Sequence, residues 1–159
     1  MSAQKLRFAL VGAGVIGNTH AKALADLPDV AELVAVVDRD RAKARDLASR
    51  YGVSVATDDL EAVLRRADVD AVTICTPSGV HADGAVAALD AGKHVVVEKP
   101  IDITLPAADR IIDAEKRSGK TVTVISQHRF DKSAEKVQQA VRDGHLGTIT
   151  SAIASHAWW

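Results

Sequence analysis

The chain has 159 residues, enough for one domain together with part of a second. Hydrophobic residues make up 47% of it, which excludes intrinsic disorder, and 20 Lys and Arg balance 21 Asp and Glu, so no basic excess indicates a nucleic-acid partner. The single cysteine, Cys75, excludes an intramolecular disulfide and fits a reducing cytoplasm. Because no apolar run reaches the ~18 residues of a membrane span and the first residues lack a signal-peptide pattern, we expect a cytoplasmic protein with no membrane partner.

Apolar, β-branched runs alternate with helical patterns over most of the chain. In chain order, strands are predicted at residues 6–11, 33–37, 53–55, 71–75, 94–97 and 121–125. Helices are predicted between them, at residues 15–27, 41–51, around 60–64, 80–91 and about 106–118. Strands this apolar are expected to be buried on both faces, and the short turns require right-handed crossovers. The prediction is therefore an α/β fold, a doubly wound parallel sheet of the Rossmann type.

Side-chain patterns also predict how the helices begin, end and face the sheet. In the first helix, Ile16, Ala23 and Leu27 recur at helical spacing and are expected to face inward. Asp58 or Asp59 is expected to cap the short third helix. The expected helix stops are Gly52, Gly92 and Gly119.

The last part of the chain differs from the rest. Residues 131–142 are predicted as a helix, followed by a turn at 144–147 and a strand at 148–159. Alone, this strand would expose an unpaired edge together with Trp158 and Trp159. We therefore expect residues 1–126 to form the Rossmann domain, and residues 127–159 to be the connecting helix and first strand of a second, substrate-binding α/β domain.

Gly12, Gly14 and Gly17 form a G-x-G-x-x-G turn between the first strand and the first helix. In that context Gly12 permits a tight turn, Gly14 lets the backbone approach a pyrophosphate, and Gly17 lets the helix pack close to the strand. Free N–H groups near Val15 and Ile16 would then face the phosphates. The alternative is a glycine-rich turn with no ligand.

Asp38 ends the second predicted strand, 21 positions after Gly17. This spacing is typical of the acid that accepts hydrogen bonds from the adenosine ribose and repels a 2′-phosphate, so NAD is favoured. Arg39 leaves NADP as an alternative, because a guanidinium can pair with a 2′-phosphate or stack on adenine. Asp38 could instead cap the next helix.

Three further polar segments follow predicted strands, where ligands of open parallel sheets bind. They are Thr76 to His81, Glu98-Lys99-Pro100 and Gln127 to Phe130. Lys99 is the best catalytic candidate, because a partly desolvated lysine can handle protons near neutral pH. Its alternative is a surface lysine on a turn.

Together these residues carry a family resemblance. The glycine turn, Asp38, Thr76-Pro77 with His81, Glu98-Lys99-Pro100, and Gln127 with Arg129-Phe130 occur in the order typical of the glucose–fructose oxidoreductase, inositol dehydrogenase and rhizopine-catabolism (Gfo/Idh/MocA) family. The chain resembles the N-terminal part of that family over essentially its whole length. The Glu-Lys-Pro turn is the most specific element.

The resemblance implies an NAD(P)-dependent oxidoreductase that transfers hydride between the nicotinamide and a secondary alcohol of a sugar, cyclitol or related polyol. It places Gly12, Gly14, Gly17 and Asp38 at the adenosine diphosphate half, and Thr76, Pro77 and His81 along the dinucleotide groove. It places Glu98 near the nicotinamide ribose and Lys99 between nicotinamide and substrate, where it would orient the hydroxyl and assist its proton transfer. Pro100 would fix the turn, in some members through a cis bond, and Gln127 and Arg129 would approach the nicotinamide end or the domain seam.

The chain departs from the family in its length. Members continue into a domain that binds the sugar, often forms the homo-oligomer interface, and holds the acid and histidine that complete the catalytic set, so this part alone is expected to be inactive. His145 and His156 are expected to be structural or solvated, Cys75 to be a core residue, and no metal is expected. The alternative is a stand-alone dinucleotide-binding module, such as a redox sensor or a non-catalytic subunit. A methyltransferase with a similar turn is disfavoured by the Glu-Lys-Pro segment.

Overall fold

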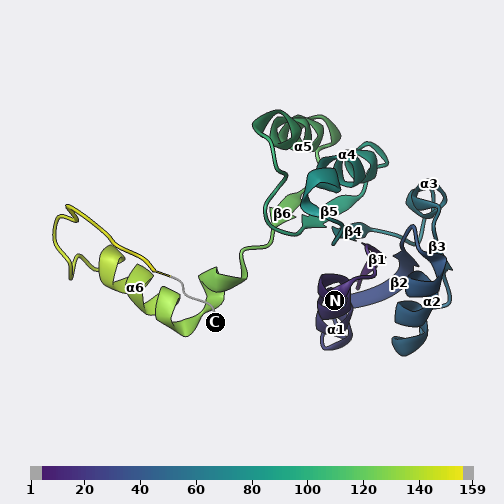
Figure 1. The fold of residues 1–159 in the computed structure, drawn as a ribbon, viewed down its shortest axis with the longest axis horizontal. Helices are drawn as coiled ribbons and strands as arrows, with labels where there is room; N and C mark the ends of the chain where they lie inside the picture. Colours follow the sequence, from purple (N-terminus) through teal and green to yellow (C-terminus); the bar gives the residue numbers. More distant parts are fainter. Residues whose placement is uncertain (1–4, 156–159) are drawn as a thin grey trace. The chain divides into compact units, whose positions relative to one another are not determined.

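The computed structural model describes residues 5–155. The chain divides into two compact units, Met1–Ile125 and Ser126–Trp159. Among the described residues, six parallel strands form one sheet in the first unit, in the order β3-β2-β1-β4-β5-β6. The strands are β1 (Leu6–Val11), β2 (Ala31–Val37), β3 (Ala56–Thr57), β4 (Ala71–Ile74), β5 (His94–Val97) and β6 (Val122–Val124). The strand order reverses between β1 and β4, so the turns after these two strands lie side by side at the carboxyl edge (Figure 1).

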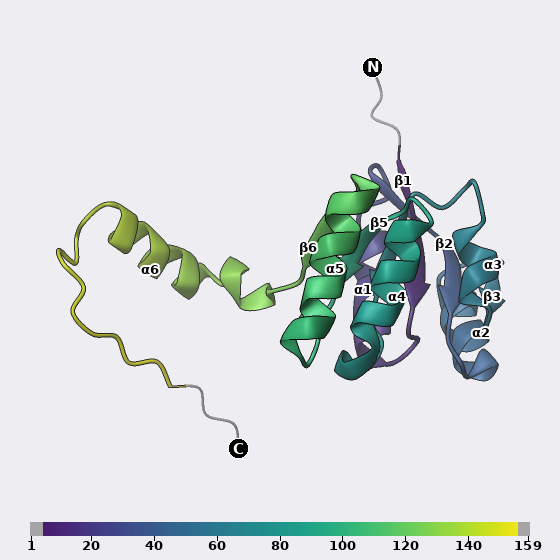
Figure 2. The same ribbon diagram turned by 90° about the horizontal axis from the view of Figure 1, so that it is seen from above.

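Helices cover both faces of this sheet. They are α1 (Val15–Ala25), α2 (Arg41–Arg50), α3 (Leu60–Leu64), α4 (His81–Asp90) and α5 (Leu105–Ser118), with a 3-10 turn η1 (Ser78–Val80) before α4. One core cluster joins α3, α4 and α5 to one face, and a second joins α1 and α2 to the other (Figures 1 and 2). Successive residues of β1 alternate between the clusters: Ala9 and Val11 belong to the first and Leu10 to the second. The predicted α/β, doubly wound Rossmann-type sheet is confirmed.

The prediction of the inward face of α1 is wrong. Ile16, Ala23 and Leu27 are all exposed. Gly17 and Ala21 are buried instead. The reason is steric, because a Cβ on Gly17 would lie 2.0 Å from a backbone oxygen of the preceding turn, so the glycine determines which side of α1 can approach the sheet.

The third strand also lies elsewhere than predicted, because residues 53–55 form the exit from α2. Gly52 has a φ of +68° beyond the end of α2, and the N–H of Val53 donates to the carbonyl of Ala48, as in a Schellman cap. The two-residue strand β3 begins only at Ala56. The cap of α3 is Asp59, whose side chain accepts from the N–H of Ala62 at 2.8 Å.

The second unit contains a 3-10 turn, η2 (Gln127–Phe130), and a helix, α6 (Lys132–Arg142). The strand predicted at 148–159 does not form in residues 148–155, because no described segment hydrogen-bonds to them as a neighbouring strand. His156, Trp158 and Trp159 lie outside the described residues. None of the described helices is both long and apolar enough to cross a membrane.

Candidate functional site

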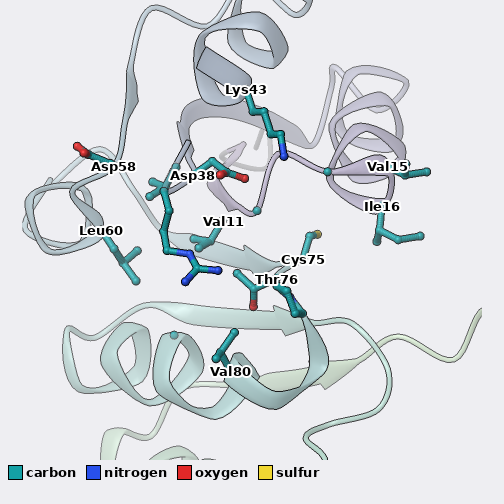
Figure 3. A pocket seen from close by; sticks show the side chains of 16 residues that line it. Val11, Val15, Ile16, Asp38, Lys43, Asp58, Leu60, Cys75, Thr76 and Val80 are labelled. Carbon is teal, nitrogen blue, oxygen red and sulfur yellow. The ribbon is translucent and has the colours of Figure 1, made fainter. Parts of the chain in front are cut away.

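A cavity of about 620 Å³ opens at the carboxyl edge of the sheet. Its walls come from the turns after β1, β2 and β4 and from the first turns of α1 and α2 (Figure 3). The volume lies in the range of small-molecule and cofactor sites. Of the predicted site residues, those that line it are Gly12, Gly14, Val15, Ile16, Asp38, Arg39, Thr76 and Pro77.

The three glycines of the turn differ in what they make room for. Gly12 has a φ of +100°, and a Cβ there would lie 2.6 Å from the carbonyl oxygen of Cys75. Gly17 allows the close approach of α1 to the turn. Gly14 has a φ of −83°, which any residue adopts, and a Cβ there would have no atom of the described residues within 4 Å apart from its neighbours in the chain. The fold therefore requires Gly12 and Gly17, whereas the space beside Gly14 is left for something other than this unit.

The N-cap residue of α1 makes no side-chain hydrogen bond with the described residues, as is also the case for α4 and α6, whereas those of α2, α3 and α5 do. The N–H of Asn18 donates to the carbonyl of Gly14, so the amides of Val15 and Ile16 precede the first intrahelical bond. Val15 is 86% exposed although it is apolar, and both residues line the cavity. An uncapped helix N-terminus of this kind attracts anions such as phosphate.

Asp38 connects the glycine turn to the turn after β2. One carboxylate oxygen, Oδ2, accepts from the N–H of Ala13 at 2.7 Å, and Oδ1 accepts from the N–H of Asp40 at 2.8 Å. The alternative that Asp38 caps α2 is wrong, because Asp40 is the cap and accepts from the N–H of Ala42. An ionised carboxylate has about four lone-pair sites, so Asp38 keeps the capacity to accept from ligand hydroxyls.

Two cations, Arg39 and Lys43, line the cavity near Asp38. Neither forms an ion pair with any of the described residues, whereas the nearby Asp58 is paired with Arg41 at 2.6 Å. Lys43 points from α2 into the cavity (Figure 3). Sequence analysis missed Lys43. The available signal was its place in the first turn of the helix that follows Asp38.

The turn after β4 brings Cys75, Thr76 and Pro77 to the cavity. Thr76 Oγ1 is buried and has no hydrogen-bond partner among the described residues. Burial raises the pKa of the Cys75 thiol to about 12, which fits the prediction of a packing residue and not a nucleophile. An unpartnered buried hydroxyl is costly, so Thr76 marks a place where a polar ligand would complete the wall.

His81 does not line the groove as expected from the sequence. It is 1% exposed, and its ring nitrogens lie 2.9 Å from the carbonyl oxygen of Pro100 and 2.8 Å from that of Thr76. The two ring nitrogens therefore face carbonyl oxygens of two different turns, one after β4 and one after β5, and an N–H of the ring donates to at least one of them. Asp102 supports the same junction, because its Oδ2 accepts from the N–H of Ala82 at 2.9 Å.

Glu98, Lys99 and Pro100 form the turn after β5, and the Lys99–Pro100 peptide is cis. The Glu98 carboxylate is 13% exposed; Oε1 lies 3.0 Å from Nε2 of His20, and Oε2 accepts from the N–H of Lys99 at 3.0 Å. Lys99 is exposed among the described residues, so its partial desolvation stays a prediction. Sequence analysis also missed His20. Its signal was its position three residues after Gly17, on the side of α1 that the glycine turns inward.

Gln127 and Arg129 belong to the second unit, where both are exposed in η2. Their expected approach to the nicotinamide end stays a prediction. His145 is exposed in the turn after α6. No group of three or more metal-ligating side chains occurs within residues 5–155.

The cavity has the features of a site for an elongated, anionic ligand with ribose hydroxyls. The uncapped helix and the open space beside Gly14 fit a pyrophosphate, and the unpartnered Thr76 hydroxyl and the Asp38 carboxylate fit further polar groups of such a ligand. A dinucleotide satisfies these requirements together.

Comparison with known proteins also indicates an NAD-binding Rossmann fold. Residues 6–126 match the model of the Gfo/Idh/MocA family, described as an oxidoreductase family with an NAD-binding Rossmann fold. The inositol 2-dehydrogenase of Rhizobium meliloti is 39% identical over 144 residues, which cover 91% of this chain and 43% of that protein. The 4-carboxy-2-hydroxymuconate-6-semialdehyde dehydrogenase of a Sphingobium species is 35% identical over 141 residues, 89% of this chain and 44% of the relative.

Among solved structures, the WlbA dehydrogenase from Bordetella pertussis in complex with NADH and UDP-GlcNAcA resembles this chain with a TM-score of 0.87 at 32% identity. The likeness covers 91% of this chain and 44% of that one. The chain thus spans less than half the length of the relatives it matches.

Proposed function

The chain belongs to the glucose–fructose oxidoreductase, inositol dehydrogenase and rhizopine-catabolism (Gfo/Idh/MocA) family as its NAD-binding Rossmann domain, and on that premise we propose that it serves a polyol or sugar dehydrogenase. In this proposal the domain holds a nicotinamide dinucleotide for reaction at a secondary alcohol of a sugar, cyclitol or related polyol. The single observation that carries the cofactor site is Gly14, a glycine that nothing in the fold requires beside an open cavity.

The chain's own groups divide between the two ends of the dinucleotide. The first-turn amides of α1, near Val15 and Ile16, would bind the pyrophosphate next to Gly14, and Asp38 would accept from the adenosine ribose. Thr76 and Pro77 would line the path toward the nicotinamide, with His81 fastening that turn from beneath. Gln127 and Arg129 are proposed at the nicotinamide end on the family resemblance alone.

We propose NAD as the preferred cofactor, with NADP retained as a weaker ligand. The Asp38 carboxylate disfavours a 2′-phosphate, because two like charges in one pocket repel each other. Arg39 and Lys43, which lack ion-pair partners within the described chain, offset part of that repulsion. With one carboxylate set against two cations, we expect only a modest preference for NAD over NADP.

Lys99 is the proposed catalytic residue. NAD(H) supplies the hydride acceptor or donor when it is bound. Lys99 would orient the substrate hydroxyl and take or return its proton, and Glu98 and Pro100 would hold the turn that carries it. Covering of Lys99 by the substrate or by a further part of the enzyme would supply the desolvation that the exposed turn lacks.

Calorimetric titration with NAD⁺, NADH, NADP⁺ and NADPH tests the cofactor site. We expect saturable binding, with NADH bound more tightly than NADPH. We expect Asp38→Ala to weaken NADH binding about tenfold and to reduce the difference in affinity between NADH and NADPH. Absence of binding by any dinucleotide would overturn the proposal, and tighter binding of NADPH by the unaltered protein would overturn the cofactor preference.

Turnover by the enzyme that contains this domain tests the catalytic part. A panel of inositols, sugars and a semialdehyde covers the substrates named in the two relatives. We expect Lys99→Met to keep NADH affinity and to lose most of kcat with the polyol. Undiminished kcat in that variant would remove Lys99 from the mechanism, and a protein that binds NADH but oxidises none of the panel would favour a non-catalytic binding module.

A further inference from the structure

A polar chain runs beneath the turn that carries Lys99, and it starts on α1. The ring of His20 lies between two partners: Nδ1 is 2.7 Å from Thr73 Oγ1 on β4, and Nε2 is 3.0 Å from Glu98 Oε1 after β5. The side chains of His20 and Glu98 are only 14% and 13% exposed, and Thr73 is 2% exposed. His20 therefore joins three elements in an almost dry environment.

The hydrogen positions follow from the chemistry of the partners. An ionised carboxylate only accepts, so Nε2 of His20 carries the hydrogen that is shared with Glu98. In the neutral ring, Nδ1 is then an acceptor and receives the hydroxyl hydrogen of Thr73. The other Glu98 oxygen accepts from the N–H of Lys99 at 3.0 Å. Both ends of the carboxylate are thereby held, one by α1 and one by the turn itself.

Packing alone does not require a histidine at this position. The buried contacts of α1 are made by Gly17 and Ala21, which belong to the apolar side of the helix. A buried polar group must be fully hydrogen-bonded to avoid destabilising the fold, whereas an apolar residue of similar size carries no such requirement. What His20 contributes beyond an apolar residue is the fixed direction of the Glu98 carboxylate.

We propose that His20 is a positioning residue that holds Glu98, and through it the Glu98-Lys99-Pro100 turn, in the arrangement that binds the nicotinamide half of the dinucleotide. This inference rests on the proposed function. Because His20 acts through Glu98, it affects the nicotinamide end and leaves the adenosine end, built by the glycine turn and Asp38, unchanged.

Two substitutions separate the two hydrogen bonds of the ring. The amide nitrogen of Gln reaches about as far as Nε2, so His20→Gln keeps a donor for Glu98, whereas the shorter Asn in His20→Asn reaches only toward Thr73. Calorimetry compares NADH with ADP, which lacks both the nicotinamide and its ribose. We expect His20→Asn to weaken NADH about tenfold with ADP unchanged, because a hydrogen bond to a charged group is lost, and we expect His20→Gln to restore most of the NADH affinity.

A double-mutant cycle with Glu98→Ala completes the test. If His20 acts through Glu98, adding His20→Asn to Glu98→Ala causes no further loss of NADH affinity. Equal weakening of NADH and ADP, identical behaviour of the Gln and Asn variants, additive losses in the cycle, or an unaltered protein that binds NADH no tighter than ADP would each overturn the inference. An unaltered protein that binds neither ligand would overturn the proposed function itself, which distinguishes the two failures.

Discussion

The two edges of the sheet in the first unit both carry cavities, but they differ in the state of their polar groups. At the amino edge, a cavity of about 370 Å³ is lined by Asp70 and Lys93 among others. Asp70 accepts three hydrogen bonds from Arg7, and Nζ of Lys93 donates to two backbone carbonyls at 2.8 and 2.9 Å. At the carboxyl edge, none of the described residues gives Thr76 Oγ1 a hydrogen-bond partner, and no described side chain caps the N-terminus of α1.

This difference shows that a hollow on the surface does not by itself identify a binding site. At the amino edge, Asp70 and Lys93 already have hydrogen-bond partners within the chain, and these bonds stabilise the fold. The carboxyl-edge groups are arranged for a partner outside the chain, which agrees with the general position of ligands in open parallel sheets. Substitutions at the amino edge should therefore change stability, and those at the carboxyl edge should change binding.

Gly17 should give the largest effect, because its role at the carboxyl edge, like that of Gly12, is structural. Gly17→Ala places a Cβ 2.0 Å from a backbone oxygen that cannot move without displacing the turn. We expect the free energy of unfolding in urea to fall by about 3 kcal/mol. A variant as stable as the unaltered protein would show that α1 can move away from the turn at no cost.

Gly14→Ala should do the opposite of Gly17→Ala, because it should weaken NADH binding and leave the stability of the fold nearly unchanged. The added Cβ meets no protein atom, so the free energy of unfolding should stay within about 1 kcal/mol, as the reduced freedom of the unfolded chain and the poorer N-cap oppose each other. NADH affinity in calorimetry should fall at least about tenfold, because the methyl group occupies the space of the ligand. Unchanged affinity would mean that no ligand approaches the backbone there.

Asp70→Asn tests the amino edge. The hydrogen bonds from Arg7 lower the pKa of Asp70 to about 2, so the native state favours the ionised carboxylate. The resulting stability is fully present above the ordinary carboxyl pKa and is lost as the pH falls toward 2. We expect the variant to melt a few degrees lower than the unaltered protein at pH 7, and the two melting temperatures to converge between about pH 4 and pH 2. We expect NADH affinity to stay unchanged. A pH-independent difference would argue against the ion pair as its cause.

Lys43→Met should give the smallest effect, confined to cofactor choice. Removing one exposed cation beside Asp38 should weaken NADPH about threefold relative to NADH, because the 2′-phosphate loses a partly screened attraction. The matched control is Lys132→Met, at an exposed lysine of α6 in the second unit, which should leave the ratio of NADPH affinity to NADH affinity unchanged. If the two variants behave alike, Lys43 has no part in cofactor selection.

Much of the fold and part of the site could be predicted from local patterns. The bounds of β1 and β5 are those predicted, because their apolar runs are flanked by clear turn residues. Gly12, Gly14, Asp38, Thr76 and Pro77 reach one cavity because the carboxyl ends of adjacent parallel strands meet at one edge. The inward face of α1 was mispredicted because apolar periodicity was given more weight than the close packing that was itself expected at Gly17.

The sequence by itself determined the alternation of strands and helices, the glycine turn and the order of polar segments, since these depend on backbone preferences and on residues near one another in the chain. Tertiary structure alone decided the partners of the polar side chains. It placed His81 between two turns, His20 between Thr73 and Glu98, and Lys43 in the cavity. The reason is that a hydrogen bond depends on atoms within about 3 Å in space, and residues 20 and 98 come that close only when the sheet has aligned their elements.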